Sequence, residues 1–378
     1  MYFSFTDEQL QFRDVVRRFM TNKAPISEAR RLMETETGYD RDVWIEACAD
    51  LGLASIHIPE CYGGLGFGSV ELCIALEEMG RALLCAPFFS SSVLAANAIL
   101  NGATERYKQK LLPQIASGEV IATLAVSEPS GVWDPSRTRL TADINGDSYR
   151  LNGTKKFVTD GVIADVIIVV ARTPGSTDNE GLSLYLVDGE SAGLRRRPLN
   201  VIDPTRKQAE LTFSNVQANL ISDPGTVAEG LSRTNDQATV ALANEMVGGC
   251  QILLESAVDY AKFRMQFGRV IGSFQAVKHK CTDMLVDVEH AKSAAYYAAA
   301  AVAEENADLP AIAALAKATV SDAYMRTAAE CIQIHGGIGF TWDHDTHLWF
   351  KRAKSSEVFL GSPAFHRERY MQAIEASA

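Results

Sequence analysis

The chain has 378 residues, of which 47% are hydrophobic and 22% are charged, and its net charge is -11. This length leaves room for two or three domains with buried cores, and the composition is typical of a globular protein. The acidic balance argues against nonspecific binding to nucleic acid.

The sequence shows no targeting or membrane signal. The N-terminus lacks a basic segment followed by an apolar one, so we expect no signal peptide. The longest apolar run, residues 294–303, is too short to span a bilayer. Seven scattered cysteines form no C-x-x-C pair, which favours a reduced protein over a disulfide framework or a zinc site. We therefore expect a cytoplasmic protein.

Residues 1–118 have the pattern of helices. Thr6 is placed to cap a helix that starts at Asp7, and the apolar residues that follow keep a helical period. The same pattern returns at 42–51, 70–84 and 104–117. The segment Ile58–Gly66 is rich in proline and glycine and predicts a loop.

From about residue 119 to 223 the pattern changes to that of strands. Apolar and β-branched runs at 120–126, 166–171 and 182–187 predict strands. Asn145-Gly146 and Asn152-Gly153 predict hairpin turns. Since no helical crossover interrupts these runs, we expect a compact antiparallel β domain.

After Pro224 the chain is helical again. Three long segments, roughly 227–264, 274–305 and 309–335, contain alanine-rich stretches that suit close contacts in a bundle. The sequence thus predicts an α+β fold that is mostly α. It has an N-terminal helical domain (1–118), a middle antiparallel β domain (119–223) and a C-terminal four-helix bundle (224–378).

Several short motifs occur in an informative order. They read PECYGGLG at 59–66, VSEP at 126–129, KFVTDG at 156–161, RMQFG at 264–268 and QIHGGIGF at 333–340. Together with the order of the domains, they resemble the acyl-CoA dehydrogenase family over essentially the whole chain. The resemblance implies the cofactor FAD and, as activity, the α,β-desaturation of an acyl-CoA.

The resemblance assigns one group of residues to the flavin ring. Phe157 would cover one face of the flat, apolar ring, and the hydroxyls of Ser127 and Thr159 would hydrogen-bond to its edge. The following loop carries Trp133 and Pro135 where the family usually has small residues. We expect these two side chains to reshape contacts to the flavin and to CoA.

A second group is assigned to the diphosphate and adenosine of FAD. Arg264 offers a rigid fork for phosphate and Phe267 packs nearby. The backbone at Gly336 and Gly337 can come close to anionic oxygens. Gln275 and Gln333 complete this group. In the family these groups come from a neighbouring subunit, so we expect an obligate oligomer.

The catalytic base is the point at which this chain departs from the family. Desaturation needs a carboxylate that removes the α proton while the β hydride passes to flavin N5. The two known positions of that carboxylate correspond here to Leu360 and Ala238, and neither can accept a proton. Glu245, two helical turns after Ala238, is the candidate base in this chain, and Glu357 is a weaker one. The alternative for Glu245 is a paired carboxylate at a helix or subunit contact.

These features leave three hypotheses. The chain is one subunit of an α2β2 heterotetramer whose homologous partner supplies the base, which is how the small chains of heteromeric acyl-CoA dehydrogenases work. Alternatively, it forms a homotetramer that uses Glu245, or it is a structural subunit that binds flavin and acyl-CoA without chemistry of its own. A flavin monooxygenase on the same scaffold would differ by rapid reaction of the reduced protein with oxygen.

The resemblance also implies partners and a metabolic setting. We expect an acyl-CoA substrate, an electron-transfer flavoprotein or similar acceptor, and a role in β-oxidation within lipid or steroid catabolism. Asp and His residues at 342–347 are of metal-ligand type, but the segment is better interpreted as the turn and helix start after the glycine motif, so we predict no metal site.

Overall fold

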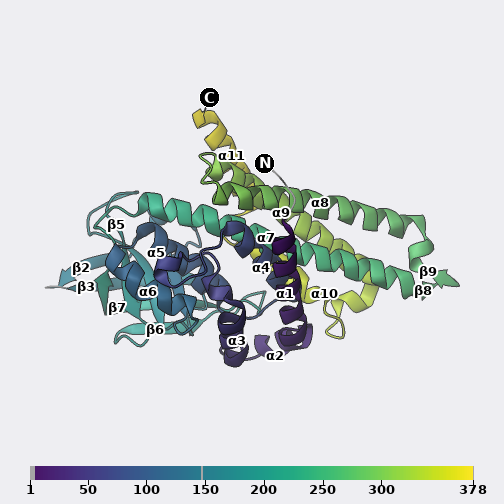
Figure 1. The fold of residues 1–378 in the computed structure, drawn as a ribbon, viewed down its shortest axis with the longest axis horizontal. Coiled ribbons are helices and arrows are strands. Elements are labelled where there is room, and N and C mark those ends of the chain that lie inside the picture. Colours follow the sequence, from purple (N-terminus) through teal and green to yellow (C-terminus); the bar gives the residue numbers. More distant parts are fainter. Residues whose placement is uncertain (1–4, 146–147, 378) are drawn as a thin grey trace. The chain divides into compact units, whose positions relative to one another are not determined.

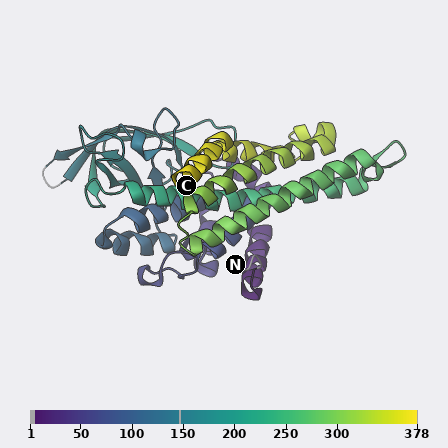
Figure 2. The ribbon, with the colours of Figure 1, turned by 90° about the horizontal axis from the view of Figure 1, so that it is seen from above.

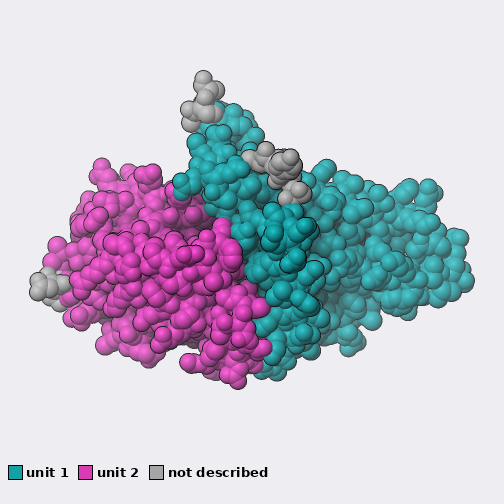
Figure 3. All heavy atoms as spheres, viewed as in Figure 1, with its two compact units in different colours: residues 1–31, 69–84, 239–378 teal, residues 32–68, 85–238 magenta. Residues whose placement is uncertain are grey.

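The computed structural model describes residues 5–145 and 148–377. The chain divides into two compact units (Figure 3). Unit 1 comprises residues 1–31, 69–84 and 239–378, and unit 2 comprises residues 32–68 and 85–238.

Unit 1 is a bundle of helices. Its helices are α1 (Asp7–Lys23), α4 (Ser69–Ala82), α7 (Ala228–Phe263, of which residues from Thr239 belong to this unit), α8 (Gln275–Ala303), α9 (Leu309–His335), α10 (Thr346–Val358) and α11 (Pro363–Ser377). Helix α2 (Ile26–Met33) is divided in sequence, with residues up to Arg31 in unit 1 and the last two residues in unit 2. A hairpin of β8 (Met265–Gln266) and β9 (Arg269–Val270) and a 3-10 turn, η5 (Ile271–Ser273), join α7 to α8. A second 3-10 turn, η6 (Gly336–Phe340), follows α9.

Local sequence explains where several of these helices start and how they pack. Thr6 caps α1 as the sequence predicts, and it forms a capping box together with Gln9. Helices α8 and α9 run side by side (Figures 1 and 2) and meet through small buried residues such as Ala298 and Ala313. Because alanine side chains are short, the two helix axes can approach closely.

Helices α4 and α7 approach so closely that their backbones touch. A Cβ atom added to Gly80 of α4 would lie 1.8 Å from the carbonyl oxygen of Glu245 in α7. A Cβ atom added to Gly248 of α7 would lie 1.8 Å from the carbonyl oxygen of Glu77 in α4. Both separations are far below van der Waals contact, so both positions require glycine.

Unit 2 combines short helices with a sheet. The helical elements are α3 (Arg41–Leu51), a π-helical segment η3 (Phe89–Ala95), α5 (Ala96–Gly102) and α6 (Glu105–Ala116), with 3-10 turns at Leu53–Ser55, Glu60–Tyr62 and Pro135–Arg137. The strands are β1 (Ala122–Ala125), β2 (Thr141–Asn145), β3 (Ser148–Thr159), β4 (Val166–Arg172), β5 (Leu182–Asp188), β6 (Leu194–Pro198) and β7 (Gln208–Leu220).

The sheet of unit 2 closes on itself. Strand β4 pairs with β2, β2 with β3, β3 with β7, β7 with β5, and β5 again with β4, while β1 and β6 pair with β4 and β7 from outside this ring. Closure removes exposed strand edges. The interior holds an apolar core that includes Leu151, Val169 and Leu211.

The predicted order of helices, then strands, then helices is confirmed, and so is the mostly α fold class. The β domain is antiparallel for the most part, but β1 and β2 pair with β4 in parallel, which the sequence pattern did not indicate. The turn predicted at Asn152-Gly153 is wrong, because both residues lie inside β3, where the register with β7 shifts between Leu151 and Asn152. The turn predicted at Asn145-Gly146 involves Gly146, which lies outside the described residues.

The predicted domain boundaries, 1–118, 119–223 and 224–378, stay a prediction. The compact units group segments by their mutual contacts, so the helices of the first 118 residues are divided between both units. Within the described part of the chain, no helix is both long enough and apolar enough to cross a membrane.

The close approach of α4 and α7 generates a stability prediction. We expect Gly248→Ala to lower the free energy of unfolding by about 1–3 kcal/mol or more, because the added methyl group forces two packed helices apart. Gly337→Ala is the matched control, since a Cβ atom there meets nothing within 4 Å. Urea unfolding of both flavin-free variants measures the difference. Equal stability of the two variants would contradict the close approach.

Candidate functional site

A β-bulge in β3 organises the residues predicted to contact the flavin ring, all of which lie in unit 2. The register between β3 and β7 shifts between Lys155 and Val158. Phe157, inside this bulge, has a φ of 59°. The amide of Lys156 donates to the carbonyl oxygen of Ser127 at 2.8 Å, which ties the bulge to the segment after β1. A bulge redirects a side chain from the regular pleat, and a left-handed non-glycine residue is typical of functional sites.

The two predicted hydroxyl donors differ in their surroundings. Ser127 is buried, and its Oγ donates to the carbonyl oxygen of Val132 at 3.3 Å. Thr159, at the end of β3, is 2% exposed, and its Oγ1 has no hydrogen-bond partner among the described residues. Thr123 donates to the carbonyl oxygen of Thr159 at 2.6 Å. Because an unpaired buried hydroxyl is costly, Thr159 has the hydrogen-bonding capacity that a ligand could use.

A buried lysine, Lys155, hydrogen-bonds to the segment that follows β1. The Nζ of Lys155 donates to the carbonyl oxygen of Val126 at 2.9 Å and to Oε1 of Glu128 at 3.1 Å. Burial lowers the pKa of Lys155 to about 8, against the opposing effect of Glu128. The Glu128 carboxylate also accepts the amides of Arg139 and Leu140. Partial burial raises the pKa of Glu128, but Lys155 and the two amides outweigh it and hold that pKa below its usual value.

Sequence reasoning missed Lys155 as a supporting residue. The signal was available, since Lys155 stands next to the KFVTDG motif and Glu128 lies within the VSEP motif. The loop that follows VSEP passes close to the bulge, since a Cβ atom on Gly131 would lie 3.3 Å from Cε2 of Phe157. The predicted influence of Trp133 and Pro135 on flavin and CoA contacts stays a prediction.

The residues predicted to contact the FAD diphosphate lie in unit 1, and the first group surrounds the β8–β9 hairpin. Phe267 and Gly268 form its tip with φ values of 53° and 75°, the two positive angles of a type I′ turn. Phe267 is 91% exposed, and its ring meets that of Phe274 edge to face at 6.1 Å. Arg264 precedes the hairpin, and its guanidinium has neither a hydrogen bond nor an ion pair with any described residue. Gln275 is exposed at the first position of α8.

The second group forms the end of α9 and the turn after it. Gln333 is exposed in the last helical turn, and Gly336 follows with a φ of 68°. A Cβ atom on Gly336 or on Gly337 would meet nothing within 4 Å, so the space beside both backbones is open.

A ring stack brings the two groups to the same end of the bundle. Tyr260, near the end of α7, stacks on His335 of α9 with ring centroids 4.3 Å apart. Because Tyr260 lies one turn before Arg264 and His335 directly precedes Gly336, the hairpin and the glycine turn are neighbours. The structure thus brings together six of the predicted residues, which are Arg264, Phe267, Gln275, Gln333, Gly336 and Gly337.

This end of the bundle also exposes several large apolar side chains. Phe263 is 67% exposed, Met265 53% and Phe340 76%, in addition to the fully accessible Phe267. Exposed apolar residues that gather in one region are typical of a surface that another chain covers.

The candidate base Glu245 lies in a buried ion pair of unit 1. Glu245 is 6% exposed, and its Oε1 accepts a hydrogen bond of 2.7 Å from Nη1 of Arg352 in α10, which is itself 3% exposed. The contact is a short, charge-assisted hydrogen bond between two buried side chains. Glu245 is thus a paired carboxylate at a contact between helices, which is the alternative to a catalytic role.

The small residues next to Glu245 on α7, Gly248 and Gly249, contact neighbouring helices and do not border open space. Gly248 packs against the backbone of α4. A Cβ atom on Gly249 would lie 2.2 Å from the hydroxyl oxygen of Tyr324, which comes from α9. Small residues beside a carboxylate can leave space for a ligand or for a close-packed helix, and the structure shows the helix contacts.

The other positions considered for the base offer no free carboxylate. Ala238 is fully buried in α7, and Leu360, between α10 and α11, is 2% exposed. Glu357 is half-buried and pairs with Lys354, three residues before it on the same helix.

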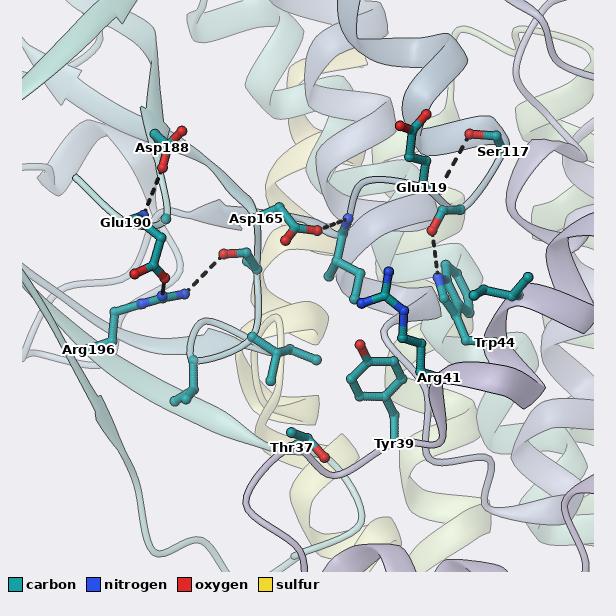
Figure 4. A pocket seen from close by; sticks show the side chains of 17 residues that line it. Thr37, Tyr39, Arg41, Trp44, Ser117, Glu119, Asp165, Asp188, Glu190 and Arg196 are labelled. Atoms are coloured by element: carbon teal, nitrogen blue, oxygen red, sulfur yellow. Dashed lines mark hydrogen bonds and ion pairs between the residues drawn. The ribbon is translucent and has the colours of Figure 1, made fainter.

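Unit 2 contains a pocket of about 820 Å³ that is lined by charged and aromatic side chains (Figure 4). Several of these groups bond to one another or to nearby backbone. Arg196 pairs with Glu190, Asp165 accepts the amide of Ile121, and Trp44 donates to the carbonyl oxygen of Gly118. None of the residues predicted to contact FAD lines this pocket.

The segment with metal-ligand residue types is packed by ring contacts. Trp342 meets His347 edge to face at 4.6 Å, and His344 shares a hydrogen bond of 3.2 Å with Thr346. Across residues 5–145 and 148–377, no group of three or more His, Cys, Asp and Glu side chains is placed to hold a metal ion.

Comparison with known families accounts for nearly the whole chain. The model described as "Acyl-CoA dehydrogenase, N-terminal domain" matches residues 6–119, the middle-domain model matches 123–216, and the C-terminal-domain model matches 233–375.

Individual proteins agree with these matches. Acyl-CoA dehydrogenase IpdE2 of Mycobacterium tuberculosis is 34% identical over 358 residues, which are 94% of each chain. Among solved structures, butyryl-CoA dehydrogenase from Megasphaera elsdenii has a TM-score of 0.92 at 28% identity, covering 99% of this chain and 100% of that one. A chain of the ChsE4-ChsE5 complex from Mycobacterium tuberculosis has a TM-score of 0.88 at 28% identity and covers 99% of both.

The order of helices and strands, the motifs and these matches agree with one another, and they confirm the predicted FAD cofactor. The chain belongs to the acyl-CoA dehydrogenase family.

Proposed function

We propose that this chain catalyses the FAD-dependent α,β-desaturation of an acyl-CoA as one subunit of a heterotetramer, and that a homologous partner chain supplies the catalytic base. The observation that carries the proposal is the state of the four positions considered for the base. Two of them hold Leu360 and Ala238. Glu245 is engaged by Arg352 and enclosed by packed helices, and Glu357 pairs with Lys354.

Several observations support FAD binding by the predicted residues. No described residue provides a hydrogen-bond partner for the buried hydroxyl of Thr159 or for the guanidinium of Arg264, and the backbone beside Gly336 and Gly337 is open. A hydroxyl, a cation and an accessible backbone turn suit the polar edge of a flavin and the oxygens of a diphosphate. When bound, FAD would accept the hydride from the substrate. In this arrangement Ser127, Phe157 and Thr159 would orient the ring, and Arg264, Phe267, Gln275, Gln333, Gly336 and Gly337 would hold the diphosphate and adenosine end.

The exposed apolar residues of the β8–β9 hairpin and the η6 turn support oligomerisation through this end of the bundle. Phe267 and Phe340 are the most exposed of them. A neighbouring subunit that covers these residues would also bring the diphosphate group of residues to a flavin held by another chain. The similarity to a chain of the ChsE4-ChsE5 complex favours a partner of a different sequence.

Similarity to IpdE2 and to butyryl-CoA dehydrogenase supports an acyl-CoA thioester as substrate and a role in lipid or steroid catabolism. An electron-transfer flavoprotein or a similar acceptor would reoxidise the flavin. We propose a cytoplasmic location on the same grounds.

Co-expression tests the heteromer. The chain would be produced alone and together with a second dehydrogenase-like chain, encoded next to it, that keeps a glutamate at one of the base positions. We expect rapid reduction of a dye acceptor by acyl-CoA only for the pair, because only the pair contains both the flavin site and the base. Bound flavin is measured on both preparations. Full activity of the chain alone would refute the heteromer.

The Glu245–Arg352 pair tests the assignment of the base. We expect Glu245→Gln to cost about 3–5 kcal/mol of stability, because it removes the charge of one partner from a buried ion pair. The double variant Glu245→Gln with Arg352→Met should recover most of that loss. Both should retain flavin reduction per bound flavin within about threefold of the parent, a change below 1 kcal/mol.

Urea unfolding and single-turnover flavin reduction measure these two quantities on the active preparation. If the double variant is stable and binds flavin but no longer reduces it, Glu245 is the base and the proposal for this residue is wrong.

Thr159 tests the flavin site itself. We expect Thr159→Val to weaken FAD binding about 2- to 12-fold, the loss of one hydrogen bond worth roughly 0.5–1.5 kcal/mol. The flavin-free protein should keep or gain stability, because an unpaired buried hydroxyl is removed. Thr123→Val is the matched control. It removes a hydroxyl that is already bonded, so it should lower the stability of the flavin-free protein by about 1 kcal/mol. Unchanged FAD affinity of Thr159→Val would contradict the assignment.

A further inference from the structure

The turn between α10 and α11 holds a leucine in an unfavourable conformation. Leu360 has a φ of 60° and is 2% exposed. The left-handed region costs a residue with a side chain about 1–2 kcal/mol, so surrounding contacts must hold it there. Gly361 follows with a φ of 113°, and a Cβ atom at this position would lie 2.5 Å from Cδ1 of Phe365. The turn therefore has a narrowly defined shape.

A buried lysine from another helix holds this turn. Lys317 of α9 is 0% exposed. Its Nζ donates to the carbonyl oxygens of Ser356 at 2.9 Å, Glu357 at 3.2 Å and Gly361 at 3.2 Å, and it lies 3.1 Å from Oγ of Ser321. Two of these carbonyls belong to the last turn of α10 and one belongs to the turn that follows. The ammonium group thus connects the end of the helix to the far side of Leu360.

The backbone bonds of the turn leave these carbonyls available to the lysine. The last turn of an α-helix ends in carbonyls without intrahelical donors. In α10, the amide of Phe359 bonds to the carbonyl oxygen of Ser355, and the amide of Gly361 bonds to that of Val358. The carbonyls of Ser356 and Glu357 lie between these two, and Lys317 supplies their donor.

A histidine fixes the carbonyl of Leu360 itself. His366 of α11 is 0% exposed, and its Nε2 lies 3.0 Å from the carbonyl oxygen of Leu360. Because a carbonyl oxygen only accepts, Nε2 carries the proton and donates it. Burial lowers the pKa of His366 to about 3, and Lys317 acts in the same direction. The imidazole is therefore a neutral donor at ordinary pH.

The burial of the Lys317 amine requires an explanation beyond packing. Burial lowers its pKa to about 7, although Glu357 opposes the shift. Apolar side chains of similar volume usually replace buried charges without loss of stability. A methionine at position 317 would fill the same space without that cost, but it could not donate to three carbonyls. Lysine differs from methionine at this position because it can donate hydrogen bonds to the carbonyl oxygens of the turn.

We propose that Lys317 and His366 are positioning residues, which hold the Phe359–Gly361 turn in the one conformation that presents the side chain at position 360 to the acyl group. The inference rests on the proposed function, in which Leu360 occupies a position where relatives carry the base. It adds that this chain holds the backbone of that position in a defined conformation although the residue there carries no carboxylate.

A gain-of-function cycle tests the inference. We expect Leu360→Glu alone to make the chain reduce its own flavin with acyl-CoA, without a partner chain, at least tenfold faster than the parent chain. In the Lys317→Met background the same substitution should give at least tenfold less. The loss should appear in the rate of flavin reduction at saturating acyl-CoA, with unchanged flavin per chain. Lys292→Met is the matched control, because Lys292 pairs with Glu289 on α8, and it should leave the gain intact.

The outcomes separate the inference from the proposed function. An equal gain with and without Lys317 overturns the inference, and so does the absence of any gain in a Leu360→Glu chain that binds FAD and acyl-CoA. If Lys317→Met does not fold, His366→Leu serves in its place, since it removes only the bond to the carbonyl of Leu360. An unchanged gain in that background also overturns the inference. If the parent chain binds neither FAD nor acyl-CoA, alone or with a partner, the proposed function fails instead.

Discussion

The contact between α4 and α7 is the constraint on which the interpretation of this protein depends. At Gly80 and Gly248 the two backbones touch, so neither helix can move away from the other without opening the bundle. Glu245 lies within this contact, and its carboxylate is directed to Arg352 of α10. One packing arrangement therefore decides three things: the course of α7, the position of α10, and the engagement of the carboxylate that could have served as a base.

Helix α10 connects the α4–α7 contact to the turn that contains Leu360. Arg352 anchors the middle of the helix to α7, and Lys317 satisfies the carbonyls at its end. The two buried cations have different counterparts, a carboxylate for Arg352 and backbone carbonyls for Lys317. Together they hold α10 and the turn after it in one conformation. A leucine at position 360 does not by itself require such contacts, so we attribute them to the family's use of this position for the base.

The flavin-contacting segment of unit 2 relies on a comparable device in a different kind of structure. The bulge in β3 places Phe157 in the left-handed region, and the buried Lys155 pairs with the partly buried Glu128 next to it. In both units, a buried lysine lies beside a left-handed non-glycine residue. Lys155 donates to the carbonyl oxygen of Val126, and Lys317 donates to carbonyl oxygens at the end of α10 and in the turn after it. Carbonyls at the ends of helices and strands need such donors because the regular ladder provides none there.

Much of this protein could be predicted from its sequence because the signals are local. The period of apolar residues predicts the helices and the strands, and Thr6 predicts the first helix cap. The order of the motifs, RMQFG and QIHGGIGF among them, carries the resemblance to the family. The absence of a carboxylate at positions 238 and 360 is also a property of the sequence alone.

Tertiary structure decided what depends on contacts between distant residues. The role of Glu245 was open in the sequence because its partner Arg352 is 107 residues away, and a strip of small residues fits a ligand as well as a helix. Asn152-Gly153 has the composition of a turn, but pairing with β7 keeps it inside a strand. Lys317 looks like any helical lysine until the fold places three carbonyls around its ammonium group. Local sequence determines the elements, whereas burial and long-range pairing determine which of their polar groups remain available for chemistry.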